Sequence, residues 1–286
     1  MRRVGLILKR GKPEAIDIAA ELAPWLTARG WEVAVLGDPG VPAMDGARLV
    51  DERELGASSD LLVVLGGDGT LLRGAQYVAD RGVPILGVNL GHLGFLTSCN
   101  PADARRALEL AFDGKLTLED RLRLRCQITR SNGEKLERFA CNDAVVSQGA
   151  LARLIEIEAL LDGARITRYR ADGLIVATPT GSTAYNLAAG GPIVTPDVDA
   201  VVVTPICPHT LSNRPVVAPA SSRIVVRLAS AASHVMVTID GQWGTELGPD
   251  DVLEISRASP PLKLYRPEGS YFDVLTSKLR WGDGEG

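Results

Sequence analysis

The stretch that decides the fold reads Leu61-Leu62-Val63-Val64-Leu65-Gly66-Gly67-Asp68-Gly69-Thr70. Its first five residues are apolar, with nothing polar on either face, a pattern that predicts a strand buried on both sides. A helix is expected directly after the turn, because apolar side chains recur there at helical spacing until Gly82. Those side chains belong to Leu71, Leu72, Ala75, Val78 and Ala79. A buried strand that runs at once into a helix is typical of a parallel α/β sheet.

The turn places one carboxylate, Asp68, among three glycines at the carboxyl end of the expected strand. In an open α/β sheet, ligands bind at that edge. Glycines let the backbone approach a phosphate closely, and the start of the helix offers unpaired N–H groups to an anion. Because a carboxylate repels a bare phosphate, Asp68 makes sense there only if it holds a metal ion or takes a proton. The structural alternative is a tight turn in which Asp68 only caps the helix.

Composition narrows the classes of protein to consider. The chain has 286 residues, 45% of them hydrophobic and 23% charged, which fits a globular protein of one large or two ordinary domains. Its net charge of −4 gives no support for binding to nucleic acid or to an anionic membrane. The apolar stretches are too short for a signal peptide or a membrane span. We therefore expect a cytoplasmic protein, whose cysteines stay reduced and, lacking CxxC spacing, form no zinc site.

The first part of the chain alternates strands with helices. Strands are expected at Val4–Leu8, Trp31–Leu36, Leu61–Leu65 and Val83–Val88, and helices from Pro13 and at Ala102–Phe112. Pro24 is expected to kink or split the first of these helices. Residues 1–115 are therefore predicted to form an α/β N-terminal domain with a parallel sheet. The apolar C-terminal tail, 266–286, is expected to pack back on this domain.

From Leu116 the pattern changes to the period of two that strands show. Leu122, Leu124, Cys126 and Ile128 alternate with Arg121, Arg123, Arg125 and Gln127. Hairpin turns are indicated at Asn132-Gly133 and Asp162-Gly163. Residues 116–265 are therefore expected to form an all-β, β-sandwich-like C-terminal domain of antiparallel sheets. The arginine-rich strand could present an RNA-binding face, but without interleaved aromatic residues a solvated outer face is favoured.

Two further clusters carry groups suited to a nucleoside. The segment from Arg170 to Pro192 contains Asp172-Gly173 beside an expected strand, then a loop rich in small hydroxyl residues that leads to Tyr185 and Asn186. Hydroxyls, an amide and exposed N–H groups match a neutral ribose or an adenine edge. Asn142-Asp143 adds an amide and a carboxylate suited to a ribose diol, although a plain turn explains that pair equally well. The P-loop, dinucleotide, protein-kinase and nucleophile-elbow motifs are absent from the sequence.

Taken together and in this order, the motifs resemble the NAD kinase family, whose members phosphorylate NAD to NADP. The resemblance spans most of the chain and is carried by Gly66–Thr70, Gly87–Asn89, Gly91–Leu96, Asn142–Asp143, Asp172–Pro192, Pro208–Leu211, Arg214–Pro215 and Asp240–Gln242. The Gly66–Thr70 turn alone is shared with diacylglycerol-type lipid kinases and, more distantly, with phosphofructokinases, whereas the Asp172–Pro192 segment is more specific. The family's α/β domain, β-sandwich-like domain and returning tail resemble the two-part pattern described above.

The resemblance implies roles for individual residues. Asp68 would be the catalytic carboxylate that takes the proton from the adenosine ribose 2′-hydroxyl. The phosphate-donor turn would consist of Gly66, Gly67, Gly69 and Thr70. The residues implied in binding NAD are Asp68, Gly69, Arg73, Asn142, Asp143, Arg153, Arg170, Asp172, Thr183, Ala184, Tyr185, Asn186, Leu187, Ala188 and Gln242. Where this chain has Asn142-Asp143 the family usually has Asn-Glu, so the acid is one methylene shorter here. His209 is expected to be structural rather than a catalytic base.

The resemblance also implies partners. The substrates would be NAD and ATP, with polyphosphate as an alternative donor, and the family is usually a homodimer or homotetramer. A divalent ion, most readily Mg²⁺, would be held by phosphate oxygens and one or two carboxylates, and no residue is assigned to it. Two other functions remain open. A diacylglycerol-type lipid kinase leaves the Tyr185–Asn186 loop unexplained, and an NAD(P)-sensing binding module leaves the carboxylate of Asp68 unexplained.

Overall fold

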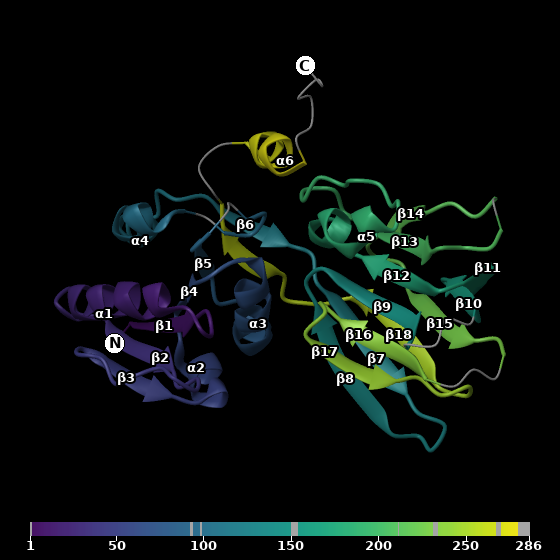
Figure 1. Cartoon of the computed structure of the whole chain (residues 1–286), viewed down its shortest axis with the longest axis horizontal. Helices are drawn as coiled ribbons and strands as arrows, with labels where there is room; N and C mark the ends of the chain where they lie inside the picture. Colours follow the sequence, from purple (N-terminus) through teal and green to yellow (C-terminus); the bar gives the residue numbers. More distant parts are fainter. Residues whose placement is uncertain are drawn as a thin grey trace. The chain divides into compact units, whose positions relative to one another are not determined.

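The computed structural model describes residues 2–91, 94–97, 99–149, 154–210, 212–230, 234–266 and 270–279, and the chain divides into two compact units (Figure 1). Unit 1 comprises Met1–Asp120 and Leu262–Gly286, and unit 2 comprises Arg121–Pro261. The sequence assigned residues 262–265 to the second domain, whereas the structure pairs this segment with the sheet of unit 1. Within the described ranges, no helix is long and apolar enough to cross a membrane.

Unit 1 is built on a seven-stranded sheet of order β3-β2-β1-β4-β5-β19-β6. Its strands are β1 (Arg3–Leu8), β2 (Glu32–Leu36), β3 (Ala47–Val50), β4 (Leu61–Leu65), β5 (Ile85–Val88), β6 (Leu118–Arg121) and β19 (Leu262–Tyr265). Its α-helices are α1 (Pro13–Thr27), α2 (Glu52–Ser58), α3 (Asp68–Val78), α4 (Ala104–Phe112) and α6 (Tyr271–Leu279). The pairs from β3 through β19 are parallel, which confirms the expected α/β domain.

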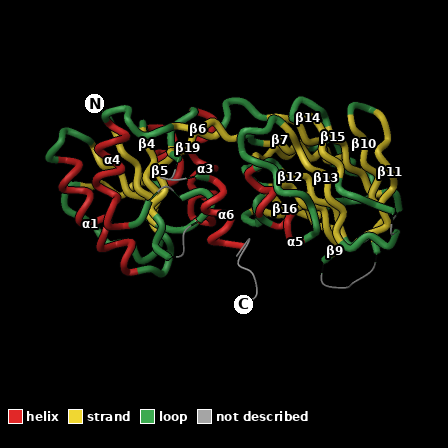
Figure 2. The backbone as a smooth tube through the Cα atoms, turned by 90° about the horizontal axis from the view of Figure 1, so that it is seen from above, coloured by secondary structure: helices red, strands yellow, loops and turns green. Residues whose placement is uncertain are grey.

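Helices cover both faces of this sheet (Figure 2). Helices α1 and α4 share one hydrophobic cluster with Leu6 and Leu8 of β1. On the other face α3 lies so close that a Cβ on Gly74 would be 3.1 Å from Ile7 Cδ1. Helix α1 continues through Pro24 and is not split there. Since Leu22, Ala23 and Leu26 are buried around that position, packing sustains the helix despite one lost backbone hydrogen bond.

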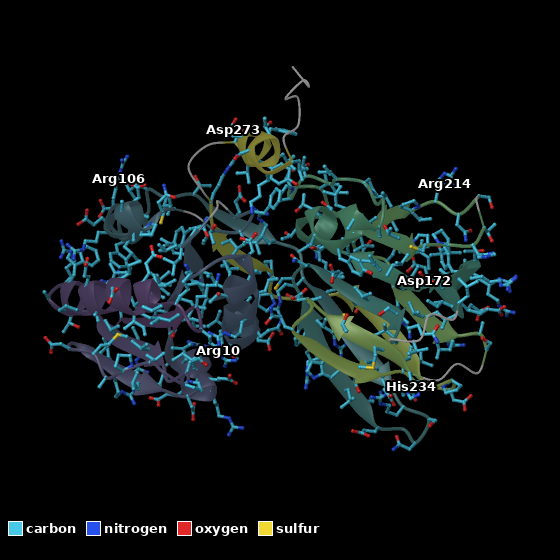
Figure 3. The ribbon with its side chains drawn as sticks, viewed as in Figure 1. Arg10, Arg106, Asp172, Arg214, His234 and Asp273 are labelled. Carbon is cyan, nitrogen blue, oxygen red and sulfur yellow. The ribbon has the colours of Figure 1, made fainter. Side chains whose placement is uncertain are left out.

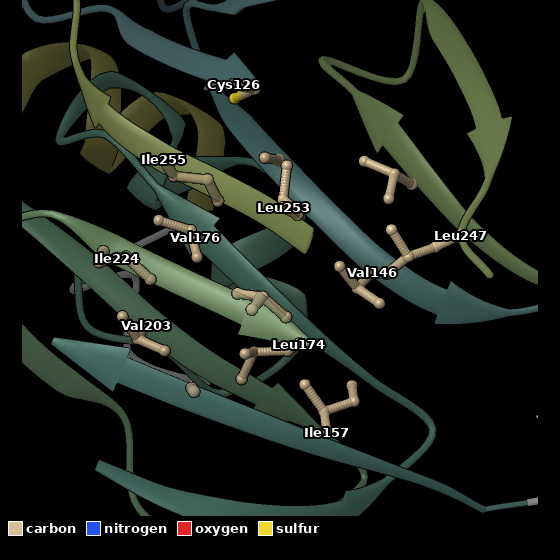
Figure 4. Packing of buried hydrophobic residues seen from close by; sticks show 14 of the residues in the cluster. Cys126, Val146, Ile157, Leu174, Val176, Val203, Ile224, Leu247, Leu253 and Ile255 are labelled. Atoms are coloured by element: carbon tan, nitrogen blue, oxygen red, sulfur yellow. The ribbon is translucent and has the colours of Figure 1, made fainter. Parts of the chain in front are cut away.

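Unit 2 contains two six-stranded sheets, of order β11-β10-β15-β18-β7-β8 and β14-β13-β12-β9-β16-β17. The strands are β7 (Leu124–Thr129), β8 (Lys135–Ala140), β9 (Asp143–Gln148), β10 (Ile155–Leu161), β11 (Ala164–Ala171), β12 (Gly173–Ala177), β13 (Ala200–Ile206), β14 (Val216–Pro219), β15 (Ile224–Leu228), β16 (Val235–Ile239), β17 (Trp243–Glu246) and β18 (Val252–Arg257). Pairing is antiparallel, for example between β9 and β12 and between β7 and β18. Apolar side chains of the two sheets meet in one core, which includes Ile157, Leu253, Val146 and Leu174 (Figure 4). The expected β-sandwich-like domain is thereby confirmed.

The hairpin signals of the sequence mark real turns. Asn132-Gly133 lies between β7 and β8, and Asp162-Gly163 lies between β10 and β11. The φ angles of Asp162 and Gly163 are 50° and 85°, the left-handed pair that a type I′ turn requires. Local turn chemistry therefore sets the register of these strand pairs.

The expectation of a solvated arginine face is wrong for Arg121 and Arg123, whose exposed fractions are 7% and 1%. Strand β6 ends at Arg121 and β7 begins at Leu124, so the alternation restarts between two strands of different sheets. The Arg123 guanidinium lies 4.7 Å from the centre of the Phe139 ring and donates to the Pro260 carbonyl at 3.2 Å. Arg123 is thus part of the interior of unit 2.

Candidate active site

The turn after β4 holds Asp68 at the start of α3, at the carboxyl edge of the parallel sheet. Its carboxylate accepts hydrogen bonds from amides outside its own helix. Asp68 Oδ2 accepts the Phe95 amide at 2.9 Å, and Oδ1 accepts the Leu96 amide at 3.1 Å. The carboxylate therefore joins the turn after β4 to the segment after β5, and this geometry disfavours the plain helix-cap alternative.

Glycines make this contact possible. A Cβ on Gly94 would lie 2.0 Å from Asp68 Oδ1, and a Cβ on Gly66 would lie 2.5 Å from Thr70 Oγ1. At Gly67, by contrast, the nearest atom to such a Cβ is Asn89 Oδ1 at 3.9 Å. Gly66 and Gly94 are thus required by close protein packing, whereas the space beside Gly67 is open to a ligand.

Arg73 of α3 lies at the same edge but is held by protein groups. Its Nη1 is 2.7 Å from Asp38 Oδ2, and its Nη2 donates to the Leu8 carbonyl at 3.0 Å. Asp38 follows β2 and also accepts from Arg10, which follows β1, at 2.6 Å. The carboxyl ends of β1 and β2 and helix α3 are thereby joined through one buried carboxylate.

The second site cluster lies in unit 2, where Asp240 organises the backbone of Asn142-Asp143. The carboxylate of Asp240 accepts the amides of Cys141, Asn142 and Asp143 at 2.8, 2.7 and 3.1 Å. The amide of Asp240 returns a hydrogen bond to the Asp143 carbonyl at 2.9 Å. Asp240 adopts φ 51°, in the left-handed region. We call this arrangement the Asp240 clamp, and it fixes how Asn142 and Asp143 leave the start of β9.

Electrostatics at the clamp favour a protonated carboxyl at Asp143. Asp143 is 5% exposed, and burial together with the charge of Asp240 raises its pKa to about 7. Burial also raises the pKa of Asp240, while the three amides and Arg123 oppose that shift. Asn142 Oδ1 is buried and has no hydrogen-bond partner among the residues that the structure describes. Near neutral pH, Asp143 can therefore donate or accept a proton, and Asn142 retains an acceptor for a ligand hydroxyl.

The loop after β12 packs directly against this pair. Thr178 Oγ1 donates to the Cys141 carbonyl at 2.6 Å, and a Cβ on Gly181 would lie 2.1 Å from the Asn142 carbonyl oxygen. The loop continues through a 3₁₀ turn, Thr180–Thr183, into the short helix α5 (Tyr185–Ala188). The predicted residues Thr183, Ala184, Leu187 and Ala188 therefore lie in the same loop as the groups that contact Asn142. Tyr185 is 47% exposed.

Asn186 differs from its neighbours because its side chain is committed to the protein. It donates to the carbonyls of Ser182 and Pro192 at 3.0 and 3.1 Å and accepts from Thr204 Oγ1 at 2.6 Å. Gly191 is required beside it, since a Cβ there would lie 2.1 Å from Asn186 Oδ1. The structure thus gives Asn186 the task of shaping the loop.

The remaining predicted residues separate into two places. Gln242 lies in the turn between β16 and β17, next to Asp240 and hence at the Asn142-Asp143 end of the sheet. Arg170 and Asp172 lie at the opposite end of β12, because Asp143 is paired with Ala177 at the last position of that strand. Figure 3 labels Asp172. Arg170 is 3.6 Å from Glu156, and its carbonyl accepts the His209 amide at 2.8 Å. Arg153 lies outside the described residues.

Comparison with known proteins agrees with this architecture. The model of the ATP-NAD kinase N-terminal domain matches residues 4–116, and that of the C-terminal domain matches residues 141–267. The NAD kinase of Geotalea daltonii is 43% identical over 99% of this chain and all of its own length, and that of Syntrophotalea carbinolica is 42% identical over the same shares.

Solved structures give the same result. A crystal structure of yeast NADH kinase complexed with NADH superposes with a TM-score of 0.88 at 28% identity, covering 99% of this chain and 88% of that one. An NAD kinase from Archaeoglobus fulgidus in complex with ATP superposes with a TM-score of 0.77 at 26% identity, covering 96% and 98%. With both domain models matched in order and full-length relatives above 40% identity, the chain belongs to the NAD kinase family.

Proposed function

We propose that this protein transfers the terminal phosphoryl group of ATP to the 2′-hydroxyl of the adenosine ribose of NAD, giving NADP. The observation that carries the proposal is the carboxylate of Asp68. It stands in a glycine-rich phosphate turn and is fixed by the Phe95 and Leu96 amides. A protein that only bound phosphate would gain nothing from a negative charge there. An enzyme that transfers a phosphoryl group to a hydroxyl does gain, because the carboxylate can accept the proton of that hydroxyl.

Asp68 acts on the attacking hydroxyl. Each of its oxygens accepts one amide, so each keeps a lone pair for the hydroxyl proton. The transition state of phosphoryl transfer is loose, and catalysis therefore consists mainly of positioning and charge stabilisation. General-base help of this kind contributes about 10²–10⁴-fold. Asp68 orients the hydroxyl along the line of transfer and accepts its proton as the bond to phosphorus forms.

The donor phosphates occupy the turn formed by Gly66, Gly67, Gly69 and Thr70. The open side of Gly67 lets phosphate oxygens approach the backbone, and the first turn of α3 follows directly. Within the described residues, no group of three or more His, Cys, Asp or Glu side chains could hold a metal ion. Mg²⁺ would therefore be held mainly by the phosphate oxygens of the donor, and Asp68 is the carboxylate within the turn that would contribute a protein ligand. When bound, the ion would neutralise charge on the phosphates.

The acceptor dinucleotide is held by the clamp end of unit 2. The unpaired Oδ1 of Asn142 accepts one ribose hydroxyl, and the carboxyl of Asp143 bonds to another. Asp143 is one methylene shorter than the Glu that is usual in the family, and the Asp240 clamp fixes its position by holding its backbone amide. Thr183 to Ala188 and Gln242 complete this side, with Asn186 shaping the loop rather than contacting the ligand through its side chain.

We further propose that the enzyme works as a homo-oligomer, a dimer or a tetramer, in which two copies share each NAD site. Asp172 precedes the first residue of β12, whereas Asp143 is paired with its last. Five strand residues span about 17 Å, too far for both carboxylates to bind one ribose. Arg170 and Asp172 would then contact a dinucleotide held by the clamp of a second copy.

The decisive experiment supplies ATP, Mg²⁺ and NAD and measures NADP with a dehydrogenase that accepts only NADP. We expect NADP to accumulate in proportion to enzyme, and to be lost when ATP is left out. Absence of NADP at micromolar enzyme would refute the proposed function. Replacing NAD by diacylglycerol in the same reaction provides the control for the lipid-kinase alternative, for which we expect no phosphorylated product.

A further inference from the structure

A basic loop follows β1 at the edge of the sheet that carries Asp68. Its sequence is Lys9-Arg10-Gly11-Lys12. Leu8 is paired with Leu65 of β4, and the Lys9 amide donates to the Leu65 carbonyl at 2.8 Å. Lys9 therefore lies level with Gly66, the first residue of the phosphate turn. Adjacent strands are about 4.8 Å apart, so the two loops are immediate neighbours.

The loop lies at the point where the strand order of the sheet reverses. Strands run outward from β1 through β2 to β3, and in the opposite direction from β4 to β5. The carboxyl ends of β1 and β4 therefore flank the point where the strand order reverses, and open α/β sheets bind ligands in the crevice outside such a point. The phosphate turn lies at the β4 side of that point, and the basic loop lies at the β1 side.

The charges at this edge are unbalanced. Asp38 is the carboxylate that neutralises Arg10 and Arg73, at 2.6 and 2.7 Å. In the part of the chain that the structure describes, the side chains of Lys9 and Lys12 form neither an ion pair nor a hydrogen bond. Four cationic groups, Lys9, Arg10, Lys12 and Arg73, outnumber the neighbouring carboxylates of Asp38, Asp68 and Glu52. The positive potential that the two lysines add favours a polyanion there.

The backbone of the loop is also accessible. Gly11 has φ 68°, and a Cβ placed on it would meet no atom within 4 Å. Helix α1 starts at Pro13, and Lys12 makes no side-chain bond that caps it. The loop therefore has both charge and room for a ligand that carries several phosphates.

We propose that the Lys9–Lys12 loop binds the phosphoanhydride chain of the phosphate donor, with Lys9 and Lys12 in direct contact and Asp38 positioning Arg10 and Arg73 beneath it. This inference rests on the proposed function and adds the donor subsite. In-line transfer requires the leaving phosphates to extend from the Gly66–Thr70 turn away from the attacking hydroxyl. The neighbouring basic loop lies next to that turn, whereas the clamp of unit 2 supplies mainly amides, hydroxyls and a carboxyl of raised pKa.

The test compares the Lys9→Gln/Lys12→Gln variant with Lys115→Gln, an exposed lysine of the same unit that pairs with Asp113. Dissociation constants for ATP and for NAD are measured separately by calorimetry. Loss of charge-assisted hydrogen bonds from the two lysines predicts a rise of ~10-fold or more in the dissociation constant for ATP of the double variant and none in the control. An unchanged ATP constant, or an equal rise for NAD, overturns the proposal.

Inorganic triphosphate is titrated in parallel, because the same chemistry occurs in ATP and in polyphosphate. Binding of triphosphate that weakens in the double variant identifies the phosphate chain itself as the group recognised. Weakening for ATP alone assigns the loop to a nucleotide donor. Since these are binding measurements, they remain informative if the NADP assay fails, so the loop and the proposed reaction are judged separately.

Discussion

At the scale of single residues, the chemistry depends on Asp68. Asp68→Asn preserves the shape of the side chain but removes the charge and the ability to accept a proton. Its Oδ1 can still accept one of the two amides, Phe95 or Leu96, so the loss of stability should be about 1 kcal/mol. We expect kcat to fall by at least ~10² with little change in NAD affinity, measured by the NADP-specific assay and by calorimetry. Near-wild-type turnover in this variant would remove Asp68 from the reaction.

Asp143 should give the protein a distinctive dependence of stability on pH. Burial and the charge of Asp240 raise its folded-state pKa to about 7, against about 3.9 in an unfolded chain. The stability contributed by the protonated form is therefore fully present below about pH 4 and is lost as pH rises through about 7.

Asp143→Asn mimics the protonated carboxyl at every pH. The unfolding free energy of the variant relative to wild type should therefore increase between pH 5 and 8, by on the order of 2–3 kcal/mol. Urea denaturation at both pH values measures this difference. A constant difference across that window would show that the Asp143 carboxyl is already ionised at pH 5 in the folded protein.

At the scale of elements, the contact between the turn after β4 and the segment after β5 depends on a missing Cβ. Gly94→Ala would place a methyl group 2.0 Å from Asp68 Oδ1 and force the two segments apart. We expect kcat to fall by about tenfold or more, since misplacement of a catalytic group by about 1 Å is costly. Gly91→Ala is the matched control, because a Cβ there meets nothing within 4 Å. Equal activity of the two variants would contradict the positional role of Gly94.

The Asp240 clamp joins β9 to the turn after β16. Asp240→Asn would turn an N–H donor toward backbone amides that also donate, and should cost about 2–4 kcal/mol of stability. Because Asn142 and Asp143 would then lose their fixed backbone, KM for NAD should rise while KM for ATP changes little. Asp162→Asn provides the control, as that exposed hairpin residue accepts one amide, from Arg223 at 2.8 Å. A rise in both KM values would indicate general unfolding instead.

At the scale of the whole molecule, the sequence predicted what is local and missed what joins distant segments. The buried strand, the Gly66–Thr70 turn and helix α3 follow from contiguous residues, and so do the hairpins at Gly133 and Gly163. The Asp240 clamp links residues 97 to 99 positions apart. Strand β3 and helix α2 were not predicted, because β3 has a mixed, partly exposed pattern and α2 is seven residues long. No periodic signal marks such elements.

The family resemblance predicts that the NAD-binding residues form one site. In the structure of a single chain, however, these residues lie in two separate places. Asp143 and Asp172 lie at opposite ends of β12, about 17 Å apart along the strand, so one chain cannot bring both carboxylates to the same ribose. Asp143→Ala and Asp172→Ala should each be nearly inactive alone. Mixed under conditions of subunit exchange, they should regain about a quarter of wild-type activity, because half of the sites in a hybrid dimer combine the two intact carboxylates. The NADP assay measures the recovery, and affinity capture of one tagged variant, followed by detection of the untagged variant in the eluate, checks that exchange has occurred. Recovery depends on the two carboxylates serving one site from different chains, since a site contained within one chain would stay defective in every mixture.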